Sequence, residues 1–232
     1  MEIVLIAGFW LDGASWDDVA APLRRAGHNA HALTLPGLES RDVDRSAIGL
    51  RDHVNAVVDV VDACADPVVL VGHSGGGAIA HAAADARPDR IRRVVYVDSL
   101  PLADGAAIND ELVAVNGEVP LPDWSEFLEE DLVDLDRSLR LKFRTIAIPE
   151  PVGVTKDKQV LSDDRRFDVP VTVIACEFST ATLRDWMAAD LPHVAELARI
   201  NDVELVDLPT GHWPQLTRPR ELAHAILAAV DR

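Results

Sequence analysis

One serine of this chain lies in a sequence pattern suited to nucleophilic chemistry. Ser74 is the centre of the string GHSGG, which directly follows the apolar run 68–71 and directly precedes an alanine-rich stretch. This context matches a nucleophile elbow, a sharp turn between a strand and a helix that lifts the serine Oγ above the sheet edge. In such a turn, Cβ atoms at Gly72 and Gly76 would clash with the neighbouring chain. A phosphate-binding loop would instead favour G-x-G-x-x-G or a GK[ST] ending, and neither is present.

A serine hydroxyl needs a general base, because it is a poor nucleophile at neutral pH. Among the eight histidines, His212 follows the last expected strand and precedes the final helix. It therefore belongs to the same carboxyl edge of the sheet as Ser74, and it fits the chain order Ser, acid, His. His73 is expected to be only the variable position of the elbow. The other six histidines are expected to be ordinary surface or interface residues: His28, His31, His53, His81, His193 and His224.

Two backbone N–H groups must also meet the oxyanion of a tetrahedral intermediate. Gly75, directly after the serine, supplies the first. The loop after the first strand, AGFWLDG, is expected to supply the second, from Phe9 with Trp10 as the next choice.

The elements that position these groups follow the rhythm of an α/β fold. Apolar runs alternate with stretches of helical periodicity, which predicts a mostly parallel sheet with helices on both faces. The expected strands are Glu2–Ala7, Asn29–Leu33, Val68–Gly72, Arg93–Val97, Val171–Ala175 and Glu204–Asp207. Residues 101–167 break the rhythm and are interpreted as an inserted helical lid, so that 1–100 and 168–232 form the core of a single domain.

Composition narrows the possible partners. The 232 residues carry 22 basic and 39 acidic side chains, a formal net charge of −17, which argues against nucleic acid and anionic membranes as partners. Two distant cysteines, Cys64 and Cys176, suggest neither a disulfide framework nor a zinc ribbon. The N-terminal apolar run is too short for a secretory signal and is interpreted as a strand. We expect a cytoplasmic protein, a monomer or homodimer, without metal or cofactor.

Four segments, AGFW, LTLPG, VGHSGGG and LPTGHW, together resemble the α/β-hydrolase fold family, in particular its small bacterial esterase-like members with an inserted helical lid. The resemblance spans nearly the whole chain. It implies a Ser-acid-His triad, no metal, and acyl transfer to water through an acyl-enzyme.

The acid of that triad is where the sequence departs from the family pattern. In many relatives the strand after the lid ends in Gly-x-x-Asp, but here Cys176 and Ser179 stand at those two positions. Some relatives place the acid one strand earlier, and Asp98 lies at the tip of that strand. Asp98 is therefore the preferred acid, and Glu177 or a Ser-His dyad are the alternatives.

These features predict a serine hydrolase of carboxylic esters or lactones of small to medium molecules. Aromatic side chains are expected to line the acyl pocket: Trp10, Trp124, Phe127, Trp186 and Trp213. Alternatives are hydroxynitrile-lyase-like chemistry, a biosynthetic cyclase, or a ligand-binding protein that does not hydrolyse. The lyase would need a positive group in the site, and no spacing places Lys142, Lys156 or Lys158 there.

Overall fold

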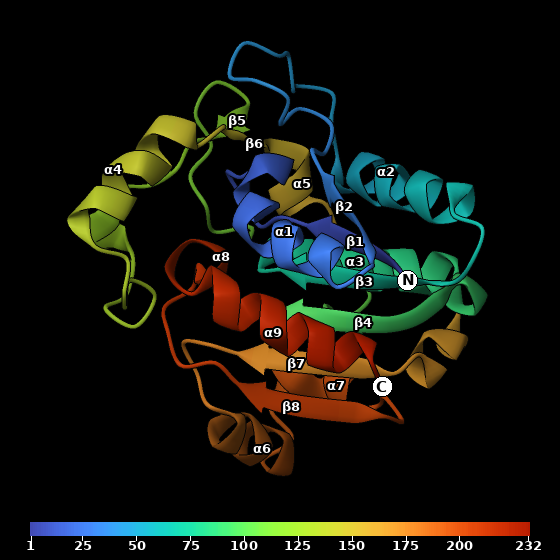
Figure 1. Ribbon diagram of the computed structural model, residues 1–232. Coiled ribbons are helices and arrows are strands. Elements are labelled where there is room, and N and C mark those ends of the chain that lie inside the picture. The colour runs from blue at the N-terminus through green and yellow to red at the C-terminus, as the bar shows by residue number, and fades with distance from the viewer.

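A computed structural model describes residues 1–232, and its centre is a six-stranded sheet of order β2-β1-β3-β4-β7-β8 (Figure 1). Every neighbouring pair of strands in it is parallel. The strands are β1 (Glu2–Ile6), β2 (Asn29–Leu33), β3 (Val68–His73), β4 (Ile91–Val97), β7 (Val171–Ala175) and β8 (Val203–Asp207). All six expected strands are present, β2 and β7 with the expected ends and the other four with ends shifted by one or two residues. The predicted fold class is confirmed.

The central strands are apolar on both faces because both faces are covered. In β1, Ile3 and Leu5 pack into one core cluster, whereas Val4 and Ile6 pack into the other. This is the burial expected of a parallel strand between two helical layers. Each face of the sheet therefore has its own apolar core.

Helices α1 and α9 cover one face, and α2 and α3 cover the other (Figure 1). The helices are α1 (Asp17–Arg25), α2 (Leu50–Ala63), α3 (Gly75–Ala86), α4 (Arg137–Ile146), α5 (Val152–Lys156), α6 (Thr180–Ala188), α7 (Ala195–Ala198), α8 (Pro214–Thr217) and α9 (Pro219–Val230). Short 3-10 turns connect several of them. They are η1 (Gly13–Trp16), η2 (Pro88–Arg90), η3 (Trp124–Glu126), η4 (Asp164–Asp168) and η5 (Pro192–Val194).

The residues between β4 and β7 contain α4, α5 and two very short strands, β5 (Glu118–Val119) and β6 (Glu150–Pro151). The two strands form a separate antiparallel ladder. The sequence did not predict this ladder, because two residues are too few for a period-two pattern. Whether residues 101–167 act as a lid stays a prediction.

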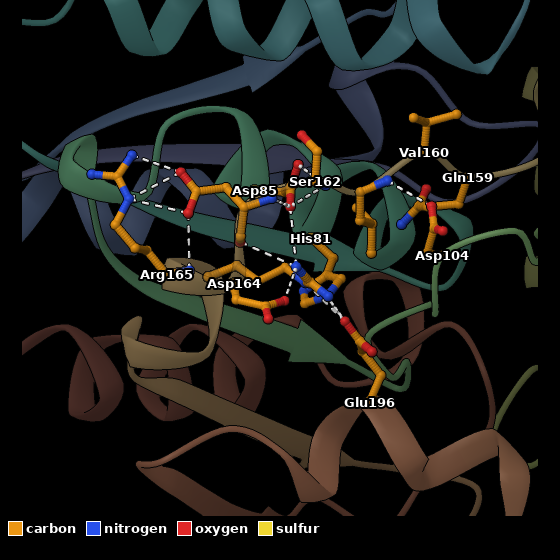
Figure 2. A network of polar contacts seen from close by, with 12 residues as sticks. His81, Asp85, Asp104, Gln159, Val160, Ser162, Asp164, Arg165 and Glu196 are labelled. Carbon is orange, nitrogen blue, oxygen red and sulfur yellow. Dashed lines mark hydrogen bonds and ion pairs between the residues drawn. The ribbon is translucent and has the colours of Figure 1, made fainter.

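A buried polar network ties α3 to η4 and α7 (Figure 2). His81 lies 3.1 Å from Glu196 through its Nε2, and the Arg166 Nε donates to the same carboxylate at 2.9 Å. Arg166 also pairs with Asp85, which in turn accepts the Ser162 N–H. The network fixes the helix that follows Ser74 to segments far away in the chain.

Candidate active site

The turn around Ser74 is strained and tightly packed. Ser74 lies between β3 and α3 with φ 51°, a left-handed conformation that is costly for a serine. A Cβ at Gly72 would come within 2.4 Å of the Gly76 carbonyl oxygen, and one at Gly76 within 2.5 Å of the Ala7 oxygen. The Ser99 hydroxyl donates to the Ser74 carbonyl at 2.7 Å. The glycines thus let the strand, the turn and the helix approach closely enough to hold the serine at the sheet edge.

Three predicted residues meet at this edge. Ser74 Oγ lies 2.8 Å from His212 Nε2, and Asp98 Oδ2 lies 2.7 Å from His212 Nδ1. The other Asp98 oxygen accepts the backbone N–H groups of Cys176, at 2.9 Å, and Glu177, at 3.1 Å. Asp98 follows β4 and the two donors follow its neighbour β7, so parallel pairing places the carboxylate and its two N–H donors side by side.

Glu177, the alternative acid, reaches the same imidazole. Its carboxylate lies 3.3 Å from His212 Nδ1, farther than that of Asp98, and about a quarter of its side chain is exposed. Burial alone would lower the pKa of His212, but the two carboxylates outweigh it and raise that pKa above the ordinary value. Burial and the nearby Glu177 also raise the pKa of Asp131. The imidazole therefore faces an acidic environment.

His73 was missed as a positioning residue. It is fully buried; its Nε2 donates to the His212 carbonyl at 2.6 Å and its Nδ1 accepts the Gln215 amide at 3.1 Å. Burial lowers the pKa of His73 to about 3, so the ring is neutral. This residue of the elbow, which the sequence analysis took to be only the variable position, thus holds the loop that carries His212.

His53 and His81 were expected to be surface or interface residues, and this was wrong. Both are buried. The Nε2 of His53 donates to the Pro36 carbonyl, and His81 contacts Tyr96 and Glu196. Hydrogen bonds to these partners offset part of the cost of burying the polar rings. The partners lie far away in the sequence, so the sequence pattern does not reveal these bonds.

The backbone N–H groups of Phe9 and Gly75 donate no hydrogen bond within the protein. Both residues line the same cavity as Ser74. Trp10, the next choice for the oxyanion, differs, because its N–H donates to the Glu150 carboxyl at 3.1 Å. Two free donors therefore lie beside the serine, one of them at the N-terminus of α3, where the helix dipole favours negative charge.

A cavity of about 470 Å³ opens in front of Ser74. Its apolar wall is formed mainly by Phe9, Trp10, Leu100, Leu102, Ile108, Leu112 and Phe127. Glu126, Asp131 and Glu177 also line it, and no lysine or arginine does. The cavity is thus lined by both apolar and acidic side chains.

Of the five predicted pocket aromatics, only Trp10 and Phe127 line this cavity. Trp213 is 1% exposed and packs against Trp124 and Phe127 in an aromatic cluster behind the wall. Trp186 packs instead against Phe178 and His193. Large aromatic side chains are more often placed by core packing than by a ligand, and composition does not separate the two.

The side chains of Asp98, Glu177 and His212 bring possible metal-ligand atoms within 4.8 Å of one another. Both nitrogens of His212 already contact other side chains of the site, Asp98 and Ser74. The arrangement therefore suits proton transfer between the serine and the imidazole better than metal coordination. The expectation of a metal-free site stays a prediction.

No helix of the structure is both long enough and apolar enough to span a membrane.

Comparison with known proteins gives the family. Esterase PIR7B of Oryza sativa subsp. japonica is 33% identical over 267 aligned residues, covering 100% of this chain and 96% of that protein. The carbendazim hydrolyzing esterase of a Nocardioides species is 37% identical, but over only 42% of this chain and 41% of its own length. An extracellular alpha/beta-hydrolase from a Paenibacillus species has the same fold, with a TM-score of 0.78, 22% identity, and coverage of 99% and 98%. The model of the alpha/beta hydrolase family matches residues 3–225. The chain therefore belongs to the alpha/beta hydrolase family.

Proposed function

We propose that this protein is a serine hydrolase that cleaves carboxylic esters or lactones of small to medium molecules through Ser74, His212 and Asp98. The observation that supports it best is the continuous hydrogen-bonded series from Ser74 Oγ through both nitrogens of His212 to Asp98. This series ends in a cavity beside two free backbone N–H groups. The esterase names of the relatives point to the same reaction class.

In the first half-reaction, Ser74 Oγ attacks the acyl carbon while its proton passes to His212 Nε2. The carbonyl oxygen takes up the electron pair and is stabilised by the N–H groups of Phe9 and Gly75. Asp98 keeps the proton on Nδ1 and stabilises the imidazolium. The tetrahedral intermediate then expels the alcohol, which receives the proton from Nε2, and an acyl-enzyme remains on Ser74.

In the second half-reaction, water replaces the alcohol. The water oxygen attacks the acyl carbon while His212 Nε2 takes a proton from the water. The N–H groups of Phe9 and Gly75 stabilise the new oxyanion. Collapse breaks the bond to Ser74 Oγ, which regains the proton, and the carboxylic acid leaves. A lactone follows the same steps, except that its alcohol stays attached to the product.

The walls of the cavity favour substrates that carry no negative charge. Glu126, Asp131 and Glu177 line it without a compensating lysine or arginine. An anionic substrate would be repelled, and its charge would have no partner on desolvation. The same absence of a cationic group in the cavity wall argues against the lyase-like alternative, in which a positive side chain would balance the leaving anion.

The test is a panel of p-nitrophenyl esters and lactones of graded length, run on the wild type, Ser74→Ala and Ser138→Ala. Ser138 is an exposed serine of α4 and serves as the matched control. We expect hydrolysis by the wild type and the control, and its loss in Ser74→Ala. Undiminished turnover by Ser74→Ala would refute the proposal. Tight ligand binding by a wild type that releases no acid would favour the ligand-binding alternative.

A further inference from the structure

The turn that carries the Phe9 N–H contains one residue in an unusual backbone conformation. Trp10, directly after Phe9, has φ 67°. This left-handed conformation is strained for a bulky side chain, so the surrounding contacts must maintain it. The oxyanion geometry of the proposed function therefore depends on what fixes Trp10.

Three hydrogen bonds from the inserted segment fix Trp10. Its N–H donates to Glu150 Oε2 at 3.1 Å, and its indole Nε1 donates to the Val119 carbonyl at 3.1 Å. Its own carbonyl accepts the Ile148 N–H at 2.9 Å. Glu150 and Val119 belong to the paired strands β6 and β5. Of the three contacts, only the one to Glu150 is made by a side chain of the inserted segment, and so it can be removed by substitution.

We propose that Glu150 is a positioning residue of the oxyanion hole. Its carboxyl accepts the Trp10 N–H and so fixes the turn in a conformation that leaves the Phe9 N–H available to the substrate. This inference rests on the proposed function. Without the carboxyl, the Trp10 N–H would be buried without a partner, and the turn would relax to satisfy it. The hydrogen bond also removes a competing donor, which leaves Phe9 and Gly75 as the pair that meets the oxyanion.

The surroundings of Glu150 favour a neutral carboxyl for this task. Its side chain is 2% exposed, and its second oxygen lies 4.0 Å from His53 Nδ1. Burial raises the pKa of Glu150 to about 8 and lowers that of His53 to about 4, so both are uncharged at neutral pH. The nearby cation, Arg45, is paired with Glu118. A neutral acceptor holds the turn without adding negative charge beside the developing oxyanion.

Two substitutions separate positioning from mere structure. Glu150→Gln keeps a neutral acceptor of the same shape, and we expect its kcat within about threefold of the wild type at pH 7. Glu150→Leu keeps the bulk but removes the acceptor, and its kcat should fall by about tenfold to a hundredfold with little change in KM, since loss of an oxyanion donor costs roughly a hundredfold or more. Thr155→Val is the matched control. It removes a buried hydroxyl of the same segment that contacts only the Val152 carbonyl, and its kcat should not change.

The pH profile gives an independent readout. As the pH rises above about 8, the activity of the wild type should fall relative to that of Glu150→Gln, because only the wild type carries a group at this position that ionises. If Glu150→Leu does not fold, Glu150→Asp, which withdraws the carboxyl by one methylene, takes its place with the same expected loss. A kcat of Glu150→Leu, or of Glu150→Asp in its place, within threefold of the wild type overturns the proposal. So does a loss of kcat in Glu150→Gln as large as in that variant.

The proposed function can fail separately. If the wild type hydrolyses no ester of the panel, that proposal fails, whatever the variants do. The role of Glu150 is then read from the rate at which a fluorophosphonate labels Ser74, because this reaction also places an oxygen in the oxyanion hole and needs no turnover. Equal labelling rates in the wild type and Glu150→Leu would overturn the positioning role.

Discussion

Replacing Asp98 with asparagine should move the proton of the neutral His212 ring from Nδ1 to Nε2, and the contacts of Asp98 show why. One of its oxygens faces two backbone donors, the N–H groups of Cys176 at 2.9 Å and Glu177 at 3.1 Å. In Asp98→Asn the amide oxygen must occupy this position, because an NH2 group there would face two other donors. The amide NH2 is then directed at His212 Nδ1, where the carboxylate oxygen had been at 2.7 Å.

A donor at Nδ1 leaves the imidazole proton on Nε2. In that tautomer Nε2 cannot take the proton of Ser74, 2.8 Å away. A wrong tautomer of this kind lowers kcat by about ten-thousandfold, which corresponds to about 5.5 kcal/mol of barrier. Glu177 is farther from Nδ1, at 3.3 Å, and partly exposed. Its change to glutamine should therefore cost less than about tenfold.

The assay is kcat and KM for a p-nitrophenyl ester in Asp98→Asn and Glu177→Gln, with thermal unfolding to show that each variant is folded. Asp207→Asn is the control, since this carboxylate bonds to Thr180 at the end of β8 and does not line the cavity. A kcat of Asp98→Asn above about a tenth of the wild-type value would rule out this role of Asp98. A larger loss in Glu177→Gln than in Asp98→Asn would assign the acid to Glu177.

Three further predictions concern pH, the buried network and the elbow. Because His212 must be neutral to act as a base and Glu177 raises its pKa, Glu177→Gln should move the acidic limb of the kcat/KM profile to lower pH; an unmoved or higher limb contradicts this. Arg166→Ala leaves the buried Asp85 without a cation and Glu196 with only His81 and a 3.9 Å contact to Arg199. It should lower the free energy of unfolding in urea by about 3–5 kcal/mol, whereas a loss near zero would show that the network is not stabilising. Gly72→Ala places a Cβ 2.4 Å from a backbone oxygen and should destabilise the fold by about 1–3 kcal/mol or more, so an unchanged thermal midpoint would be inconsistent with the tight elbow.

The parts of the site that could be predicted are those encoded in local sequence. The elbow needs small residues around Ser74, and the loop of His212 directly follows a strand, so both are visible in short segments. Buried parallel strands leave continuous apolar runs, which is why the sheet was predicted well. Local chemistry and hydrophobic pattern were sufficient in these places.

The rest depends on contacts between distant segments. Asp98 is distinguished from Glu177 only once β4 and β7 are paired, because that pairing brings the two supporting N–H groups to Asp98. Glu150 lies 140 residues from Trp10 and has no sequence signature at all. Trp213 and Trp124 were expected in the pocket wall, but an apolar ring packs equally well behind it. Sequence pattern identifies a buried aromatic residue but not which side of the wall it occupies.

The most direct test of the nucleophile is covalent labelling with a fluorophosphonate, followed by peptide mapping and activity measurement on the same sample. We expect a single adduct on Ser74, loss of esterase activity in proportion to the adduct, and labelling slowed at least about a hundredfold in His212→Ala. An adduct on any other residue, or full activity in a protein labelled at Ser74, would contradict it.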